Sequence, residues 1–337
     1  MIREAIEALV RGQSLTMDQA AQTMDEIMSD EATPAQFGAL VTALRLKGET
    51  SDEIAGMARV MRERSLHVNV DGPVVDVVGT GGDASHSFNI STTTAFVVAG
   101  AGVTVAKHGN RAMSGACGSA DALEALGVKI DLSPEGVERC LKEVGFGFMF
   151  AQRYHPSMRF AAGPRREIGI RTVFNILGPL TNPASADAYL LGVSDPDVAG
   201  KMVRVLGELG TTHALVVHGL DGLDEITLGD ATRVWELQNG TVSEYSLTPE
   251  DLGFSRAPRE ALAASSVEES TRMLTEVLEG KTGPARDVVL MNAGAALLAA
   301  DRASDFQEGI VMAAESIDSG SALAKLDALV ELSQKLE

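Results

Sequence analysis

Apolar residues in the first 65 positions of the chain recur at helical spacing. One predicted helical face collects five of them, namely Ile2, Ala5, Ile6, Leu9 and Val10. Three sequences that can form capping boxes follow, at Thr16–Gln19, Thr33–Gln36 and Thr50–Glu53. Together with a polar linker at 67–72, this pattern predicts a small all-helical N-terminal lobe over residues 1–70.

From Val74 onwards, short apolar runs alternate with longer amphipathic ones. We expect strands at 74–78, 103–106, 146–151, 189–193 and 214–218, and helices at 91–99, 120–126, 134–144 and 196–209. Such alternation predicts an α/β lobe over 71–337, with a central, mostly parallel sheet flanked by helices. Ligands of such sheets bind beyond the carboxyl ends of the strands.

Residues 155–183 interrupt this alternation. His155-Pro156 begins a predicted helix with several arginines, and Pro179 and Pro183 break the chain again. We expect part of 155–185 to cross back and join the helical lobe. Asn239-Gly240 predicts a tight hairpin. After Ser265 the pattern is helical to the end, and the small residues of 293–300 predict close packing against the sheet.

Composition narrows the class of protein. A chain of 337 residues, 45% hydrophobic, can form a large core in two lobes. Its net charge of −19 argues against nucleic acid or an anionic membrane as partner. Cys117 and Cys140 predict neither a disulfide framework nor a metal cluster. With no signal-peptide core or bilayer-length apolar run, we expect a cytoplasmic protein.

Two predicted strands end in loops suited to phosphate groups. The first, 74–78, stops at Gly79, Gly81 and Gly82, which Asp83 follows, before Asn89-Ile90-Ser91-Thr92 opens a small-residue helix. The second runs into the basic stretch 107–111, Lys-His-Gly-Asn-Arg. Glycines let backbone N–H groups approach an anion, and a helix N-terminus adds partial positive charge.

Two common nucleotide-binding patterns, the P-loop and the dinucleotide fingerprint, do not fully match the first loop. The P-loop pattern G-x-x-x-x-G-K-[ST] does not occur in the sequence. Gly79-x-Gly81-x-x-Ala84 fits the loose dinucleotide fingerprint, but a polar loop follows it, and the next strand ends in Lys107-His108 instead of an acidic residue. A glycine-rich turn without a ligand remains an alternative for this loop alone.

Four motifs in this order, G-T-G-G-D, N-I-S-T, K-H-G-N-R and G-S-A-D-x-L-E-A-L-G, resemble the anthranilate phosphoribosyltransferase family. The resemblance continues through His155-Pro156, 171–183 and 218–225, and so covers nearly the whole chain. It implies transfer of the phosphoribosyl group of phosphoribosyl pyrophosphate to the amine of anthranilate, in tryptophan biosynthesis. It also implies Mg²⁺ as cofactor, a two-lobed fold similar to the nucleoside-phosphorylase type, and a homodimer formed through the helical lobe.

The resemblance also implies site residues. Those for phosphoribosyl pyrophosphate are Gly79, Gly82, Asp83, Ser87, Asn89, Ile90, Ser91, Thr92, Lys107, His108, Gly109, Asn110, Arg111, Ala112, Met113, Ser114, Gly115 and Ser119. Those for anthranilate are Gly79, His108, Asn110 and Arg165, whose guanidinium can pair bidentately with a carboxylate. The metal ligands would be Ser91, Asp224 and Glu225.

Several roles stay open at the level of sequence. Asp224-Glu225 alone would suit a solvated acidic turn, and only the preceding His-Gly-Leu-Asp-Gly-Leu favours a metal. Asn89 or Ser91 could be an ordinary helix cap, and His155 could be structural. Ser87 stands where this motif usually has threonine. No nucleophile–base pair is evident, which favours direct displacement.

Two other functions compete with this prediction. A pyrimidine-nucleoside phosphorylase of the same fold would not require the paired carboxylates Asp224-Glu225 or the intact 107–111 motif. A non-catalytic, nucleic-acid-binding relative should carry a basic surface, which a net charge of −19 disfavours.

Overall fold

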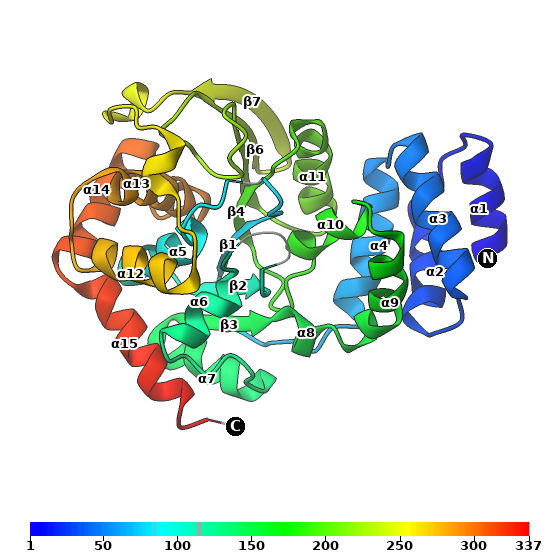
Figure 1. The fold of residues 1–337 in the computed structure, drawn as a ribbon, viewed down its shortest axis with the longest axis horizontal. Helices are drawn as coiled ribbons and strands as arrows, with labels where there is room; N and C mark the ends of the chain where they lie inside the picture. The colour runs from blue at the N-terminus through cyan, green and yellow to red at the C-terminus, as the bar shows by residue number, and fades with distance from the viewer. Residues whose placement is uncertain (84, 113–115, 337) are drawn as a thin grey trace.

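The structure is a computed structural model that describes residues 1–83, 85–112 and 116–336. Its N-terminal lobe consists of helices (Figure 1). Its helices are α1 (Ile2–Val10), α2 (Met17–Met28), α3 (Pro34–Lys47) and α4 (Ser51–Glu63). All three predicted capping boxes form, at the starts of α2, α3 and α4. Of the predicted apolar face, Ile2, Ala5 and Leu9 are buried, whereas Val10, the last residue of α1, is 71% exposed.

The larger lobe is built on a seven-stranded sheet of order β3-β2-β1-β4-β5-β6-β7. Its strands are β1 (Val75–Gly79), β2 (Val105–Gly109), β3 (Phe146–Phe150), β4 (Ala188–Gly192), β5 (His213–Gly219), β6 (Thr232–Gln238) and β7 (Thr241–Leu247). The first five are parallel, and β6 and β7 are antiparallel. The predicted hairpin is confirmed, and both of its turn residues, Asn239 and Gly240, have the positive φ that a type I′ turn requires. The sheet is therefore mixed but mostly parallel, as predicted.

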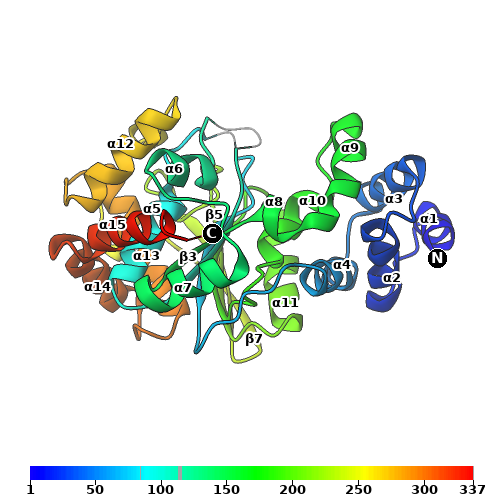
Figure 2. The ribbon, with the colours of Figure 1, turned by 90° about the horizontal axis from the view of Figure 1, so that it is seen from below.

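Helices cover both faces of this sheet (Figure 2). On one face lie α5 (Ile90–Gly100) and the C-terminal helices α13 (Pro284–Ala299), α14 (Phe306–Asp318) and α15 (Ser321–Ser333), with α6 (Ser119–Ala125), α7 (Pro134–Val144) and α12 (Val267–Leu278) beside them. On the other lies α11 (Pro196–Glu208), which also contacts α4 of the helical lobe. As expected, the small-residue end of α13 is closely packed: it belongs to a helix that contacts β1, β4, β5 and α5.

The segment between β3 and β4 returns to the helical lobe. It contains α8 (Ala151–Tyr154), η1 (Pro156–Met158), α9 (Arg159–Ile168), α10 (Phe174–Leu177) and η2 (Gly178–Leu180). Helix α9 contacts α2 and α3, and the Phe174 and Phe37 rings lie 5.2 Å apart. The Arg62 guanidinium of α4 donates to the Leu180 carbonyl at 2.7 Å. These contacts support the expected crossing, and the division into 1–70 and 71–337 stays a prediction.

The strand order places a topological switch between β1 and β4. The chain moves outward from β1 to β2 and β3, and then returns to the other side of β1 with β4. In sheets of this kind ligands bind beyond the carboxyl ends of the strands at the switch point. The first predicted phosphate loop follows β1, so it lies at this position.

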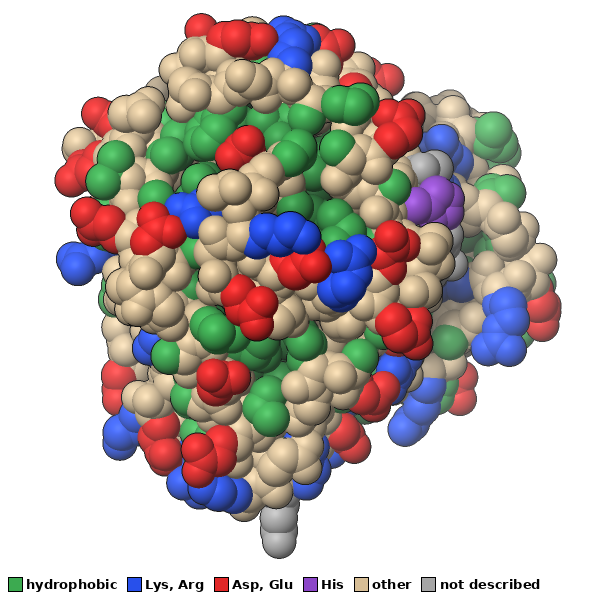
Figure 3. Space-filling model, turned by 60° about the vertical axis from the view of Figure 1, so that its left-hand side comes forward, with side chains coloured by type: hydrophobic (Ala, Val, Ile, Leu, Met, Phe, Trp, Pro, Cys, Tyr) green, Lys and Arg blue, Asp and Glu red, His purple; other side chains and the backbone are tan. Residues whose placement is uncertain are grey.

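Charged side chains of both signs are interspersed on the face that Figure 3 shows. Within the described ranges, none of the helices combines the length and apolar character needed to cross a membrane.

Candidate active site

The carboxyl ends of β1 and β4 are glycines that pair with each other, Gly79 with Gly192. The loop after β5 lies across both. A Cβ on Gly79 would be 2.7 Å from Oδ2 of Asp224, and one on Gly192 would overlap the Asp224 carbonyl oxygen. Oδ2 of Asp224 also accepts a hydrogen bond from Gly81 N at 2.7 Å. The structure thus brings the predicted residues Gly79 and Asp224 together. The loop that carries Asp224 can approach β1 and β4 this closely because Gly79 and Gly192 have no side chains.

Because backbone atoms occupy the space beside Gly192, we expect Gly192→Ala to destabilise the protein by about 3 kcal/mol or more. Gly163 in α9 has no neighbouring atom within 4 Å of its would-be Cβ, so Gly163→Ala should be neutral or stabilising by up to about 1 kcal/mol. Denaturant unfolding of both variants checks this. Equal stability of the two would mean that the Asp224 loop can move away from β4.

The Asp83, Asp224 and Glu225 carboxylates lie close enough to affect one another's pKa. Burial raises the pKa of Asp224 to about 7, and the nearby Asp83 charge adds to the shift. Burial also raises the pKa of Glu225 well above its usual value, with Asp224 contributing and Lys107 opposing. Oδ2 of Asp83 is buried and has no hydrogen-bond partner among the described residues. These carboxylates raise one another's pKa, and a bound divalent ion would offset their charge.

These residues fit Mg²⁺ better than a metal held by protein alone. Among the described residues, no three His, Cys, Asp or Glu side chains are arranged to hold a metal ion by themselves. Mg²⁺ typically takes one or two carboxylates and fills its remaining positions with water and substrate phosphates. The Ser91 backbone opposes part of this rise in the pKa of Glu225, so Ser91 lies near the Glu225 carboxylate.

Asn89 occupies the N-cap position of α5, but its side chain makes no capping hydrogen bond. Its amide Nδ2 instead donates to Ser270 Oγ at 3.0 Å and to Cys117 Sγ at 3.1 Å. An ordinary capping role is therefore wrong for this side chain. Asn89 ties the start of α5 to α12 and to the segment before α6.

The other predicted residues at the start of α5 differ in exposure. Ile90 and Thr92 are 2% and 0% exposed, so their side chains belong to the core. Ser91 is half-buried, and its Oγ accepts a hydrogen bond from Lys107 Nζ at 3.4 Å. Of these residues, Ser91 has the side chain best placed to meet a ligand.

Strands β1 and β2 are joined largely by side chains. Their ladder has a single register pair, Val75 with Val105. Beyond it, Asp76 Oδ1 accepts from His108 N at 3.3 Å, and Asp76 Oδ2 accepts from Asn182 Nδ2 at 2.7 Å. Asn182 Nδ2 also donates to the Ala106 carbonyl at 2.8 Å. Asn182 belongs to the segment that returns from the helical lobe. By bonding to both strands it helps to fix the position of β2, and with it the positions of Lys107 and His108.

Lys107 lies near Glu225 of the acidic cluster formed by Asp83, Asp224 and Glu225, and only 2% of its surface is exposed. Its Nζ donates to the carbonyl of Val77. Burial lowers the pKa of Lys107, while Asp76 and Glu225 oppose this. Burial raises the pKa of Asp76 to about 6. Sequence reasoning missed Asp76 and Asn182, although an acidic residue inside the apolar run 74–78 was a usable signal.

His108 and His155 lie side by side, with ring centroids 5.0 Å apart. Burial lowers the pKa of His108 well below its usual value and that of His155 to about 4. Both rings are therefore neutral at pH 7. Within the described part of the chain, Nε2 of each is buried without a hydrogen-bond partner. His155 thus lies against a predicted site residue, and its role stays open.

Arg165 projects from α9 with its guanidinium 5.3 Å from the centre of the Phe174 ring. Burial lowers its pKa, and no carboxylate in the described residues pairs with it. A half-buried guanidinium beside an aromatic ring can accept an aromatic carboxylate as its partner.

Arg171 and Ser194 also hold the first loop, and sequence reasoning missed both. Arg171 donates to Gly82 O at 3.0 Å and to Ser194 Oγ at 3.2 Å, and Ser194 Oγ donates to Gly81 O at 3.1 Å. Gly81 and Gly82 have φ values of +64° and +76°, which suit glycine. Arg171 lies inside the long 171–183 motif, which was the available signal.

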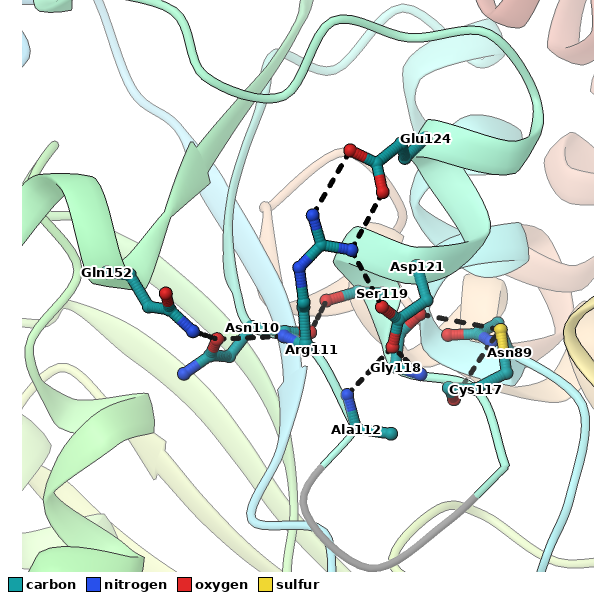
Figure 4. Close-up of polar contacts among 10 residues, drawn as sticks. All are labelled: Asn89, Asn110, Arg111, Ala112, Cys117, Gly118, Ser119, Asp121, Glu124 and Gln152. Atoms are coloured by element: carbon teal, nitrogen blue, oxygen red, sulfur yellow. Dashed lines mark hydrogen bonds and ion pairs between the residues drawn. The ribbon is translucent and has the colours of Figure 1, made fainter. Parts of the chain in front are cut away.

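The remaining predicted residues lie further along the two loops. Ser87 Oγ accepts from Ser85 Oγ at 3.1 Å, and Ser87 forms a β-bridge with Ala263. A Cβ on Gly109 would be 2.9 Å from the Phe148 ring. Asn110, Arg111, Ala112 and Ser119 gather at the start of α6 (Figure 4). Met113, Ser114 and Gly115 lie outside the described residues.

Comparison with known proteins identifies the family of this chain. A model described as "Glycosyl transferase family, a/b domain" matches residues 71–323, and a "helical bundle domain" model matches residues 3–65. The anthranilate phosphoribosyltransferase of Chloroflexus aurantiacus is 57% identical over 335 residues, 99% of each chain. The chain belongs to the anthranilate phosphoribosyltransferase family. Its activity is that of an anthranilate phosphoribosyltransferase, in tryptophan biosynthesis, as the motifs predicted.

Solved structures of the anthranilate phosphoribosyltransferase family share the fold. The enzyme of Thermus thermophilus superposes with a TM-score of 0.92 at 44% identity, covering 98% of this chain and 99% of its own. The Saccharomyces cerevisiae enzyme in complex with phosphoribosyl pyrophosphate (PRPP) and Mg has a TM-score of 0.91 at 28% identity, with 99% and 98% covered. The same yeast enzyme in complex with 4-fluoroanthranilate has a TM-score of 0.89 at 26% identity, with the same shares covered.

Proposed function

We propose that the crevice at the carboxyl ends of β1 and β4 binds PRPP with Mg²⁺, and that anthranilate binds beside it, towards α9. The yeast complexes with PRPP and Mg and with 4-fluoroanthranilate support this assignment. The observation that carries it is the position of Asp224, whose carboxylate lies over the first glycine loop at the switch point, with Asp83 and Glu225 beside it.

Ser91, Asp224 and Glu225 would hold Mg²⁺, which when bound neutralises the diphosphate as it leaves the ribose. The chain itself contributes the glycine loop, whose carbonyls bond to Arg171 and Ser194, and the start of α5, where a helix N-terminus favours negative charge. Lys107 beneath them limits the charge of the acidic cluster. Positioning and charge stabilisation of this kind each supply several kcal/mol of catalysis.

Anthranilate needs orientation more than activation, because its aromatic amine is already neutral at pH 7. Arg165 pairs with its carboxylate in this proposal, and the neutral His108 ring, together with Asn110, faces its amine or ring. With both reactants held in this way, the amine attacks ribose C1 directly as the diphosphate departs. No covalent enzyme intermediate is required.

The predicted homodimer is also a proposal, and exposed apolar side chains on the helical lobe support it. Met1, Val10 and Leu46 are 44%, 71% and 84% exposed, on or beside α1 and α3. Large apolar side chains left in water in this way are available to a second copy of the chain.

Anthranilate fluorescence tests the proposed reaction. On mixing the protein with anthranilate, PRPP and Mg²⁺, we expect a steady loss of signal that stops with EDTA and resumes when Mg²⁺ is added in excess. A rate unchanged by EDTA would remove Mg²⁺ from the proposal. No signal loss with folded protein would reject the acceptor, and nucleosides with phosphate would be tested next.

A further inference from the structure

The Asp121 carboxylate, in the first turn of α6, joins the two sides of the segment that connects β2 to α6 (Figure 4). Its Oδ2 accepts hydrogen bonds from Ala112 N at 2.9 Å and from Gly118 N at 3.0 Å. Its Oδ1 accepts from Arg111 Nη1 at 3.0 Å. One carboxylate therefore bonds to the chain where it leaves β2 and again where it enters α6.

The two sides meet in direct contact. A Cβ on Gly118 would lie 2.7 Å from the Asn110 carbonyl oxygen and would overlap Ala112 N. The Asn110 carbonyl also accepts from Ser119 Oγ at 3.3 Å and from Ala120 N at 3.2 Å. Glycine at 118 is thus needed for this approach, and the Asp121 carboxylate satisfies the backbone N–H groups that the approach brings together.

The Arg111 guanidinium belongs to the same cluster. Besides Asp121, it pairs bidentately with Glu124, at 2.7 Å and 3.1 Å, and it lies 5.6 Å from the centre of the Phe150 ring. Bidentate pairs of this kind are geometrically specific and strong for a surface contact. These contacts with two carboxylates use three of the five N–H donors of the guanidinium, so the Arg111 side chain is largely committed within the protein.

We infer that Asp121 is a positioning residue for PRPP, and that the Arg111 side chain completes this clasp instead of binding the substrate. The clasp is the set Asp121, Arg111 and Glu124. It sets the relative position of Asn110, Ala112 and Ser119, which come from both sides of the segment and are candidate PRPP contacts. The inference rests on the proposed PRPP site.

Asp121→Asn and Glu124→Gln form a matched pair of variants. Both remove the charge of a carboxylate partner of Arg111, but only Asp121→Asn also weakens the hydrogen bonds of two backbone N–H groups, because an uncharged amide oxygen is a weaker acceptor than a carboxylate. We expect Asp121→Asn to raise the KM for PRPP about tenfold or more, with little change in the KM for anthranilate, because charged hydrogen bonds are worth about 1.5 to 3 kcal/mol. Glu124→Gln should change either constant less than about threefold. Similar effects of the two variants, or equal effects on both substrates, would overturn the inference.

Amide exchange tests the clasp without any substrate. Exchange of the Ala112 and Gly118 N–H groups should accelerate in Asp121→Asn and stay as in the wild type in Glu124→Gln. Unchanged exchange in Asp121→Asn would contradict the clasp. A wild type that shows this protection but no turnover with PRPP would instead reject the proposed function.

If Asp121→Asn does not fold, Arg111→Ala and Glu124→Ala test whether the Arg111 guanidinium binds PRPP or only completes the clasp. Each breaks the same bidentate pair, so the clasp predicts PRPP KM values within about threefold of each other. A far larger effect of Arg111→Ala would show that its guanidinium binds the substrate directly.

Discussion

Replacing Arg165 with alanine should raise the KM for anthranilate by about 100-fold and leave the KM for PRPP within about threefold. The guanidinium is half-buried against Phe174 and has no carboxylate partner among the described residues. Truncating one partner of a desolvated charge pair costs about 2 to 5 kcal/mol, and about 2.7 kcal/mol corresponds to 100-fold. Steady-state kinetics with each substrate varied in turn measures this split.

Two further variants make the test specific. Arg165→Lys keeps the charge but loses the planar fork, so it should recover only part of the affinity for anthranilate. Arg166→Ala removes the neighbouring exposed arginine of α9 and should leave both KM values unchanged. If Arg165→Ala raised both KM values equally, Arg165 would contribute to the general shape of the cleft and not to the anthranilate carboxylate.

The double variant Asp224→Asn with Glu225→Gln should lower Mg²⁺-dependent kcat/KM by about 100-fold to 1000-fold. It removes the half-buried Asp224 carboxylate, which contacts the glycine loop, and the buried Glu225 carboxylate beside it, while an asparagine oxygen can still accept from Gly81 N. Titration of activity with Mg²⁺ should show a weaker dependence, and addition of Mg²⁺ with PRPP should raise the Tm of the wild type more than that of the variant.

Stability separates this effect from misfolding. The metal-free Tm of the double variant should equal or exceed that of the wild type, because like charges leave a buried cluster. Asp230→Asn, an exposed carboxylate in the same β5–β6 connection, is the control and should keep wild-type Mg²⁺ dependence. Unchanged Mg²⁺ dependence in the double variant would return Asp224-Glu225 to a simple acidic turn.

Much of the fold was predictable from local patterns. The capping boxes, the Asn239-Gly240 hairpin and the alternation of strands and helices each depend on residues a few positions apart, and each is present in the structure. The positions of the glycine-rich loop after β1 and the basic loop after β2 were predictable for a related reason. Glycine, hydroxyl and basic residues at strand ends have a chemistry that sequence shows directly. The exposure of Val10 was not predictable in this way, because periodicity alone does not define how wide a buried stripe is.

Contacts between side chains that are far apart in the sequence were not predictable from local patterns. Asp76 and Asn182 are 106 residues apart in the chain, yet they share the hydrogen bond that helps to place β2. The contact of Asp224 with Gly79 and Gly192 likewise joins three separate strand ends. Nothing in the spacing of these residues predicts such contacts, because they depend on strand order and on the approach of distant loops.

The sequence by itself therefore determined the two-lobed α/β fold, the glycine-rich and basic loops at two strand ends, and the family, since these depend on periodicity and on ordered motifs. Only the tertiary structure decided that His155 lies against His108, that Arg165 is left without an acidic partner among the described residues, and that the Arg111 guanidinium is held by Asp121 and Glu124. A motif shows which groups are present. Whether a charged group is free for a ligand depends on the neighbours that folding brings within hydrogen-bonding distance.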